Sequence, residues 1–199
     1  MKKLLLVLLL CVSQLAAAKS VDVELKGPVT MASMWELKFK LRYHINSGDT
    51  VYLRIDSPGG VISAGEMFIA ELKRLQKRGK VICDASGKVI SMAMMIFINC
   101  KHRINTNPDA MMLHHNPLFG YTGYLNAPIM REFIRQLQEI SEKADKHFLE
   151  VTKMDEDYME YLRDTDKILT AKEMKLKAKC IFNFRKVRNK WRRVAGCQK

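Results

Sequence analysis

Residue types that together hydrolyse acyl bonds occur in separate parts of the chain, and Ser91 is the first of them. It follows an apolar stretch and a turn at Gly87, and it precedes a second apolar stretch. At the start of a helix its hydroxyl would lie beside backbone N–H groups that can stabilise an oxyanion. Serine is also a common helix cap, so both a nucleophile and a cap are consistent with this position.

Two adjacent histidines, His114 and His115, end another apolar stretch and precede Asn116 and Pro117. A histidine at the end of a strand can face a pocket and act as a general base. Neighbouring residues of a strand point to opposite faces, so we expect only one of the two to fill this role. A surface histidine, or a hydrogen-bonded histidine in the core, is the alternative interpretation.

The other candidates are polar or glycine-rich turns. Asp164 and Asp166 lie in a polar segment before residues 168–171, where either could orient a histidine or merely cap a helix. Gly59 and Gly60 directly follow an expected strand. Two glycines allow a sharp turn and bring backbone N–H groups close to a ligand, although a turn without function has the same pattern.

The periodicity of apolar residues indicates the elements that position these candidates. We expect strands at residues 21–25, 51–55, 81–85, 103–105 and 111–113, and helices at residues 32–43, 64–78, 92–98 and 129–151. Residues 117–123 are expected to form a loop. Strands that alternate with helices indicate an α/β protein with a mainly parallel sheet and right-handed crossovers.

Composition indicates one ordinary globular domain. The chain has 199 residues, of which 48% are hydrophobic and 28% charged, and these values exclude a disordered, collagen-like or coiled-coil protein. Lys and Arg number 34 against 21 Asp and Glu, which gives a net charge of +13. No CxxC motif or Cys/His ligand spacing is present, so we expect neither a metal site nor a cofactor.

The first 18 residues have the three parts of a secretory signal peptide. A KK start is followed by an apolar run at residues 4–12 and by AAA at residues 16–18. The run is shorter than the roughly 20 residues that span a bilayer, although a retained membrane anchor is the rival interpretation. We therefore expect an exported protein, periplasmic or secreted if its source is bacterial.

Export changes the interpretation of the cysteines. Cys11 lies within the signal segment, and Cys83, Cys100, Cys180 and Cys197 remain. In an oxidising compartment these four permit three full disulfide pairings. Cys180 and Cys197 flank the basic end of the chain and are the pair that we expect. Cys83 lies in an apolar run, where a buried free thiol is equally consistent.

Four motifs in a fixed order resemble the proteolytic subunit of the Clp protease. They are DSPGGVISAG at residues 56–65, GKVISM at residues 87–92, MLH at residues 112–114 and DKILTA at residues 166–171. The resemblance covers about residues 21–173. It implies a crotonase-like ββα superhelix with a mainly parallel sheet and a long handle helix. It also implies a serine peptidase that acts on polypeptides.

The site that the resemblance implies is a triad of Ser91, His114 and Asp166. Ser91 would attack the scissile carbonyl, His114 would take the serine's proton, and Asp166 would orient His114. The backbone N–H groups of Gly60 and Met92 match the oxyanion-hole positions of the family. Each such donor contributes about 3 kcal/mol of transition-state stabilisation.

The resemblance also implies a substrate-binding surface and an assembly. Gly59 and a segment that contains Phe119, Gly120 and Tyr121 match positions that contact the substrate. That segment corresponds to the family's handle strand, which pairs rings of subunits, so a homo-oligomer is expected. His115 occupies a position where the family usually has glutamine, and it is therefore not the expected base.

The chain also departs from the family pattern. Ile90 stands before the serine in place of a small residue, and Ala93 stands in place of a glycine, so both crowd the turn. The N-terminal loops that dock the family's ATPase partner have no counterpart. With export, this favours a peptidase that works without an unfoldase or ATP.

The chain closes with a basic segment, residues 179–199, in which Phe182, Phe184 and Trp191 lie among lysines and arginines. Such a segment can bind an anionic membrane surface, or it can be a solvated tail. We therefore expect a signal peptide at residues 1–18, a peptidase domain at residues 19–178 and this basic segment.

The sequence thus predicts an exported, ATP-independent serine endopeptidase of short or unfolded polypeptides. The crowding at Ile90 and Ala93 makes a non-catalytic binding or scaffold protein with the same fold the main alternative. Acyl-group chemistry like that of other crotonase-fold proteins is a weaker one, because those enzymes do not need the Ser, His and Asp set.

Overall fold

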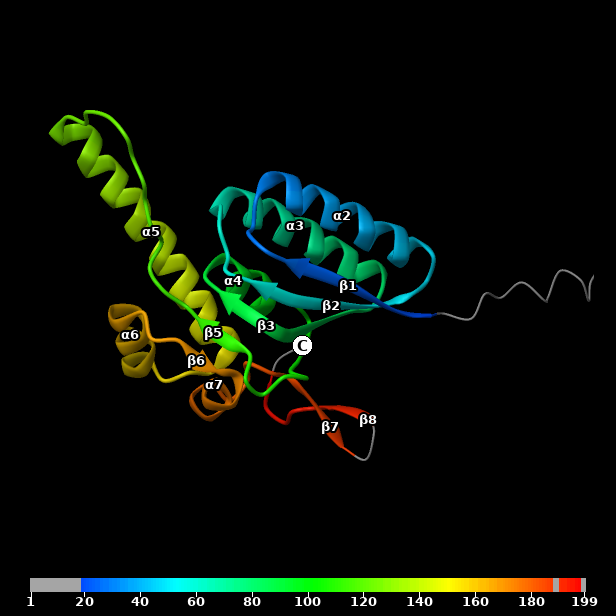
Figure 1. The fold of residues 1–199 in the computed structure, drawn as a ribbon. Helices are drawn as coiled ribbons and strands as arrows, with labels where there is room; N and C mark the ends of the chain where they lie inside the picture. Colours follow the sequence, from blue (N-terminus) through cyan, green and yellow to red (C-terminus); the bar gives the residue numbers. More distant parts are fainter. Residues whose placement is uncertain (1–18, 188–189, 198–199) are drawn as a thin grey trace, which may run out of the picture.

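The computed structural model describes residues 19–187 and 190–197 (Figure 1), so the signal peptide expected at residues 1–18 lies outside the described part. The main sheet is formed by β1 (Ser20–Lys26), β2 (Thr50–Ser57), β3 (Val81–Ile90), β4 (His102–Ile104), β5 (Met111–Leu113) and β6 (Leu169–Thr170). Its order is β1-β2-β3-β5-β6, with β4 also paired to β3. All pairs are parallel except β5 with β6. The mainly parallel α/β sheet expected from the sequence is confirmed.

Helices cover this sheet and extend from it. They are α2 (Met31–Asn46), α3 (Ile62–Arg78), α4 (Met92–Ile98), α5 (Ala127–Thr152), α6 (Glu156–Thr165) and α7 (Ala171–Lys177). Figure 1 shows α2 and α3 side by side against the strands β1 and β2, while α5 projects from the body as a long handle. The handle helix expected from the sequence is therefore present.

Alternating burial explains why the central strands form a sheet. Along β2 the residues Val51, Leu53 and Ile55 are fully buried, while the residues between them are only partly so. This period of two is that of a strand with one strongly buried face. Phe68 and Leu72 of α3, one helical turn apart, are also fully buried in the same core.

Two short helices, α6 and α7, were not expected from the sequence, although each begins at a capping residue. The side chain of Asp155 accepts the N–H of Tyr158 at the start of α6. Thr170 and Glu173 form a reciprocal capping box at the start of α7. Such side chains satisfy backbone donors that have no partner within the helix. The two helices were missed because each is too short for its apolar periodicity to stand out.

The basic segment is folded as a hairpin and is not a loose tail. Strands β7 (Phe184–Val187) and β8 (Lys190–Arg193) pair antiparallel, and a disulfide joins Cys180 to Cys197. The buried guanidinium of Arg103 donates to four carbonyls, two of them those of Cys180 and Ile181. Burial lowers the pKa of Arg103 to about 10. These contacts attach the segment to the body of the domain.

The structure contains a second disulfide between Cys83 and Cys100. The Cα atoms of the two pairs are 6.1 Å and 5.4 Å apart, within the range of ordinary disulfides. The expected pairing of Cys180 with Cys197 is confirmed. The alternative of a free thiol at Cys83 is wrong, because Cys83 is bonded to Cys100.

Over residues 19–187 and 190–197, no helix combines the length and the hydrophobicity needed to cross a membrane.

Candidate active site

Ser91 lies at a sharp turn between β3 and α4. Its backbone has φ 58° and ψ −124°, a conformation that residues with a side chain rarely adopt. Its N–H donates to the carbonyl of Leu113 on the neighbouring strand β5, at 3.0 Å. Its own side chain makes no capping bond to α4, which removes the simple cap as its role. A strained serine between a strand and a helix is the geometry of a nucleophile elbow.

The glycine turn after β2 packs directly against this elbow. A Cβ atom on Gly59 would lie only 2.5 Å from the carbonyl oxygen of Ile90 and 2.7 Å from Cβ of Ser91. Gly59 has φ +85° and Gly60 has φ +148°, both in the region that favours glycine. Only a residue without a side chain fits between the two segments. The glycines of the DSPGG motif therefore allow the turn after β2 to pack against Ser91.

The two backbone N–H groups expected to form an oxyanion hole belong to Gly60 and Met92. Met92 is the first residue of α4, so its N–H has no acceptor within the helix. Gly60 pairs with Val29 in an isolated parallel bridge. These are the groups that the sequence assigned to an oxyanion hole. Met92 directly follows Ser91, and Gly60 directly follows the Gly59 that packs against the elbow.

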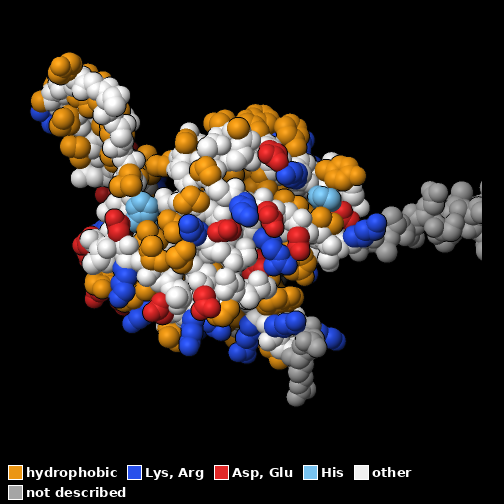
Figure 2. All heavy atoms as spheres, viewed as in Figure 1, with side chains coloured by type: hydrophobic (Ala, Val, Ile, Leu, Met, Phe, Trp, Pro, Cys, Tyr) orange, Lys and Arg blue, Asp and Glu red, His pale blue; other side chains and the backbone are white. Residues whose placement is uncertain are grey.

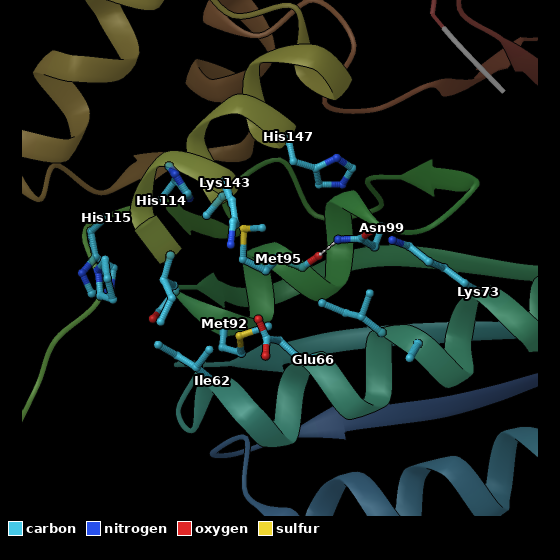
Figure 3. A pocket seen from close by; sticks show the side chains of 16 residues that line it. Ile62, Glu66, Lys73, Met92, Met95, Asn99, His114, His115, Lys143 and His147 are labelled. Atoms are coloured by element: carbon cyan, nitrogen blue, oxygen red, sulfur yellow. Dashed lines mark hydrogen bonds between the residues drawn. The ribbon is translucent and has the colours of Figure 1, made fainter. Parts of the chain in front are cut away.

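A cavity of about 520 Å³ opens beside the elbow (Figure 3). Ser91, Met92, His114 and His115 line it, together with residues of α3 and α5. Figure 3 shows the two imidazole rings apart from each other. Both histidines line the cavity because β5 ends at Leu113 and the alternation of a strand does not extend to them; that only one of them acts as the base stays a prediction.

His114 is bound by a carboxylate that the sequence did not single out. Its Nε2 lies 2.7 Å from Oδ1 of Asp145, on α5, and its ring stacks on Phe148 with the centroids 4.5 Å apart. Oδ2 of Asp145 pairs with the guanidinium of Arg163, on α6, at 3.2 Å. The side chain of His114 is only 4% exposed. The ring is therefore fixed on one side by a hydrogen bond and on its face by an aromatic ring.

Burial by itself would raise the pKa of Asp145. The hydrogen bond from His114 and the ion pair with Arg163 outweigh that effect and lower the pKa below its ordinary value. Burial alone would likewise lower the pKa of Arg163, but its hydrogen bond and ion pair with Asp145 raise it above its usual range. Asp145 is therefore ionised at neutral pH, and it accepts from His114 on Oδ1 and from Arg163 and Ser141 on Oδ2.

Asp166, the aspartate that the resemblance placed in the triad, lies near the other histidine. Its Oδ1 is 3.9 Å from Nδ1 of His115, which is beyond hydrogen-bond distance. Its side chain is 64% exposed and its backbone has φ 47° at the end of α6. The structure thus brings Ser91 and His114 to one cavity and places Asp166 at the surface beside His115.

The expected substrate segment lies along the outer part of the handle. Phe119 packs on Phe133 of α5, with the ring centroids 4.8 Å apart, and Tyr121 is half exposed. The segment has no strand pairing in the single chain, because a strand needs a neighbour to bond to. Within the described residues, Phe119, Gly120 and Tyr121 are not among those that line the cavity.

One signal in the sequence could have revealed Asp145. It precedes Phe148 by three positions and follows Ser141 by four, so it shares the inward face of the amphipathic helix. A carboxylate on that face requires a partner, and Ser141, His114 and Arg163 surround it.

In residues 19–187 and 190–197, no three His, Cys, Asp or Glu side chains gather as metal ligands do.

An elbow serine and a carboxylate-bound histidine on a mainly parallel α/β sheet are the chemical groups that serine hydrolases use. A model of the family described as Clp protease matches residues 11–177. The chain belongs to the Clp protease family, and its α/β architecture is consistent with the crotonase-like fold of that family.

Two curated relatives show how far the similarity extends. The ATP-dependent Clp protease proteolytic subunit 2 of Pseudomonas aeruginosa is 29% identical over 107 residues, which cover 53% of this chain and 51% of the relative. The protein of the same description from Prochlorococcus marinus is 29% identical over 131 residues, 65% of this chain and 64% of the relative. The aligned part thus spans between 51% and 64% of the length of these relatives.

Proposed function

We propose that this chain is an exported, ATP-independent serine endopeptidase of short or unfolded polypeptides. The observation that carries the proposal is the strained elbow at Ser91, which shares a cavity with the buried, carboxylate-bound His114. Membership of the Clp protease family supports the same class of reaction. Ser91 is the proposed nucleophile and His114 the proposed base.

The reaction follows from these groups. The oxygen of Ser91 attacks the scissile carbonyl carbon while its proton passes to His114, and the N–H groups of Gly60 and Met92 stabilise the oxyanion. The intermediate collapses as the C–N bond breaks, and His114 gives the proton to the leaving amine. Water then repeats the sequence on the acyl-enzyme, which releases the acid and restores Ser91.

Two features support the proposed location and substrate. Disulfides persist in oxidising compartments, and the two in this structure support export from the cytosol. Such a compartment supplies no cytosolic ATP, so the substrate must reach the cavity already short or unfolded. Apolar side chains of α3, α4 and α5 line the cavity together with charged and polar ones, and the apolar part suits the side chains of an unfolded chain.

The mature protein is expected to cleave a permanently unfolded polypeptide, such as carboxymethylated casein, and to leave the folded form of a stable globular protein intact. Ser91→Ala is expected to abolish cleavage because the attacking oxygen is gone. Product formation would be followed by mass spectrometry in the two proteins side by side. Binding of the unfolded polypeptide without turnover by the wild type would instead favour the scaffold alternative.

We also propose that the protein is a homo-oligomer that uses the handle. Hydrophobic side chains gather at the projecting end of α5 (Figure 2), and Phe119, Tyr121, Ile129 and Ile134 are each about half exposed. Large exposed apolar patches mark interaction surfaces. Light scattering is expected to give a multiple of the chain mass, and Ile134→Glu should reduce that mass. A wild type that stays monomeric at high concentration would refute the assembly.

A further inference from the structure

Basic side chains line the end of the cavity that lies away from His115. Lys73 of α3 and His147 of α5 lie there with Asn99, which follows α4 (Figure 3). Lys143, one helical turn before His147 on α5, is a third basic residue of the same wall. Three elements distant in sequence therefore bring positive charge to one part of the cavity.

A second cavity, of about 340 Å³, adjoins the first and continues this positive charge. Lys73, Asn99 and His147 line both cavities. Among the described residues, no Asp or Glu lines the second cavity. Its other charged residues are Lys77, Lys101 and Arg103.

The nearby carboxylates do not neutralise these basic groups. Glu66 lines the first cavity, and Glu150 lies close enough to His147 to affect its charge. In the described part of the chain, neither of them forms an ion pair with Lys73 or Lys143. Unpaired positive charges that line one cavity attract an anionic group.

The ring of His147 gives a second, independent indication of a ligand. Its Nε2 is buried and has no hydrogen-bond partner among the described residues. Burial and the charge of Lys73 lower the pKa of His147, so the ring is neutral near pH 7. A neutral imidazole that carries its proton on Nε2 can donate one hydrogen bond from that atom. Buried polar atoms are seldom left without a partner, and a carboxylate oxygen would accept this bond.

The apolar part of the same cavity indicates what kind of anion fits. Ile69 and Ala70 of α3 and Met92 and Met95 of α4 line it together with the basic residues. A free inorganic ion gains nothing from apolar side chains. A carboxylate carried on a polypeptide contacts the apolar wall with its hydrocarbon part and the basic groups with its charge.

We propose that the basic end of this cavity binds a carboxylate of the substrate, so that the peptidase selects acidic polypeptides. Lys73 and Lys143 supply the charge, and His147 donates a hydrogen bond from Nε2. This inference rests on the proposed function, because it names the class of polypeptide that the proposed peptidase takes. The carboxylate belongs either to an aspartate or glutamate side chain or to the C-terminus of a short chain.

The test is the affinity of Ser91→Ala for three short, otherwise neutral peptides, measured by isothermal titration calorimetry. The first has a central glutamate and blocked ends, the second has glutamine in its place, and the third is the glutamine peptide with a free C-terminal carboxylate. Charge-assisted hydrogen bonds are expected to make a carboxylate peptide bind roughly 10-fold to 100-fold more tightly than the second peptide. Tighter binding of the first peptide identifies a side chain, and tighter binding of the third identifies the chain end.

Lys73→Gln, introduced into Ser91→Ala, is expected to remove most of this preference. Lys73 is exposed, so its replacement leaves the fold intact. Lys146→Gln is the matched control, because Lys146 is an exposed lysine of α5 that lines neither cavity. Each variant loses one positive charge, so attraction by the overall charge of the protein falls equally in both. A preference that is lost in Lys73→Gln and kept in Lys146→Gln supports the carboxylate site.

Equal affinities for the three peptides, or an equal loss in the two lysine variants, would overturn the carboxylate site. Cleavage of the same peptides by the wild type separates that result from the proposed function. A wild type that cleaves all three peptides at equal rates keeps the peptidase proposal and overturns the selection of acidic polypeptides. A carboxylate preference in Ser91→Ala, with no cleavage by the wild type, supports the site and overturns the peptidase proposal.

Discussion

Replacing Gly59 by alanine is expected to lower peptide hydrolysis by about 100-fold or more. The added methyl group would lie 2.5 Å from the carbonyl oxygen of Ile90, 2.7 Å from Cβ of Ser91 and 2.8 Å from the backbone N of Met92. Two of these three neighbours are backbone atoms, which cannot rotate away. The elbow must therefore shift, and the nucleophile and one oxyanion donor would shift with it.

Gly48→Ala is the matched control for this variant. Gly48 has φ +81°, close to the +85° of Gly59, but an added Cβ there meets nothing within 4 Å. Both variants carry the same backbone strain of about 1–2 kcal/mol, and only Gly59→Ala also moves the elbow. Hydrolysis per folded molecule, with the folded fraction taken from circular dichroism, should stay at the wild-type level in Gly48→Ala. Equal losses in the two variants would contradict the proposed role of the close packing.

The second large effect is expected when the disulfide Cys83–Cys100 is removed. Cys83 lies on β3 and Cys100 follows α4, so the loop that they close contains the whole elbow. Closing a loop of 17 residues stabilises the fold by about 3 kcal/mol. The double variant Cys83→Ala, Cys100→Ala should lose about this much free energy of unfolding and a large part of its hydrolysis.

The other disulfide supplies an internal control because Cys180 and Cys197 are also separated by 17 residues. Its removal should reduce the free energy of unfolding by a similar amount, about 3 kcal/mol, because the closed loops have equal length. Hydrolysis at a temperature where both variants are folded should fall only in the Cys83, Cys100 variant. Denaturant unfolding and peptide turnover, measured on the same samples, check both statements. An equal loss of hydrolysis in the two variants would contradict the claim that the Cys83–Cys100 disulfide holds the turn at Ser91 in its active geometry.

The elements around the serine could be predicted because their patterns are local. The expected helix at residues 92–98 is α4 with the same bounds, and the expected strand at residues 111–113 is β5. A buried strand, a glycine turn and an apolar helix follow one another within a few residues, so periodicity alone locates Ser91. The parallel sheet then follows from the alternation of strands and helices.

The contact between His114 and Asp145 could not be predicted in this way because it depends on residues distant in sequence. Asp145 and His114 are 31 positions apart and meet only because α5 packs beside the end of β5. The resemblance indicated Asp166, the first residue of the last motif, as the triad carboxylate, and that assignment stays a prediction. Sequence order gives no information on which of two aspartates lies within hydrogen-bond distance of a given ring.

The basic end of the chain shows another limit of local patterns. Its alternation of charged and aromatic residues fits a solvated tail, yet Arg103 and two cysteines hold it against the body. These anchors lie far from the segment or at its ends, so its own composition does not indicate them. The contact with an anionic membrane stays a prediction for the exposed basic side chains of β7 and β8.

The central claim is that Ser91 is an activated nucleophile, and the most direct measurement is the mass of its covalent adduct. Wild-type mature protein and Ser91→Ala would be treated with a fluorophosphonate, digested and analysed by mass spectrometry. We predict one adduct, on the peptide that contains Ser91, and none in Ser91→Ala. An unmodified Ser91 in a folded wild-type protein, or equal modification of both proteins, would contradict the claim.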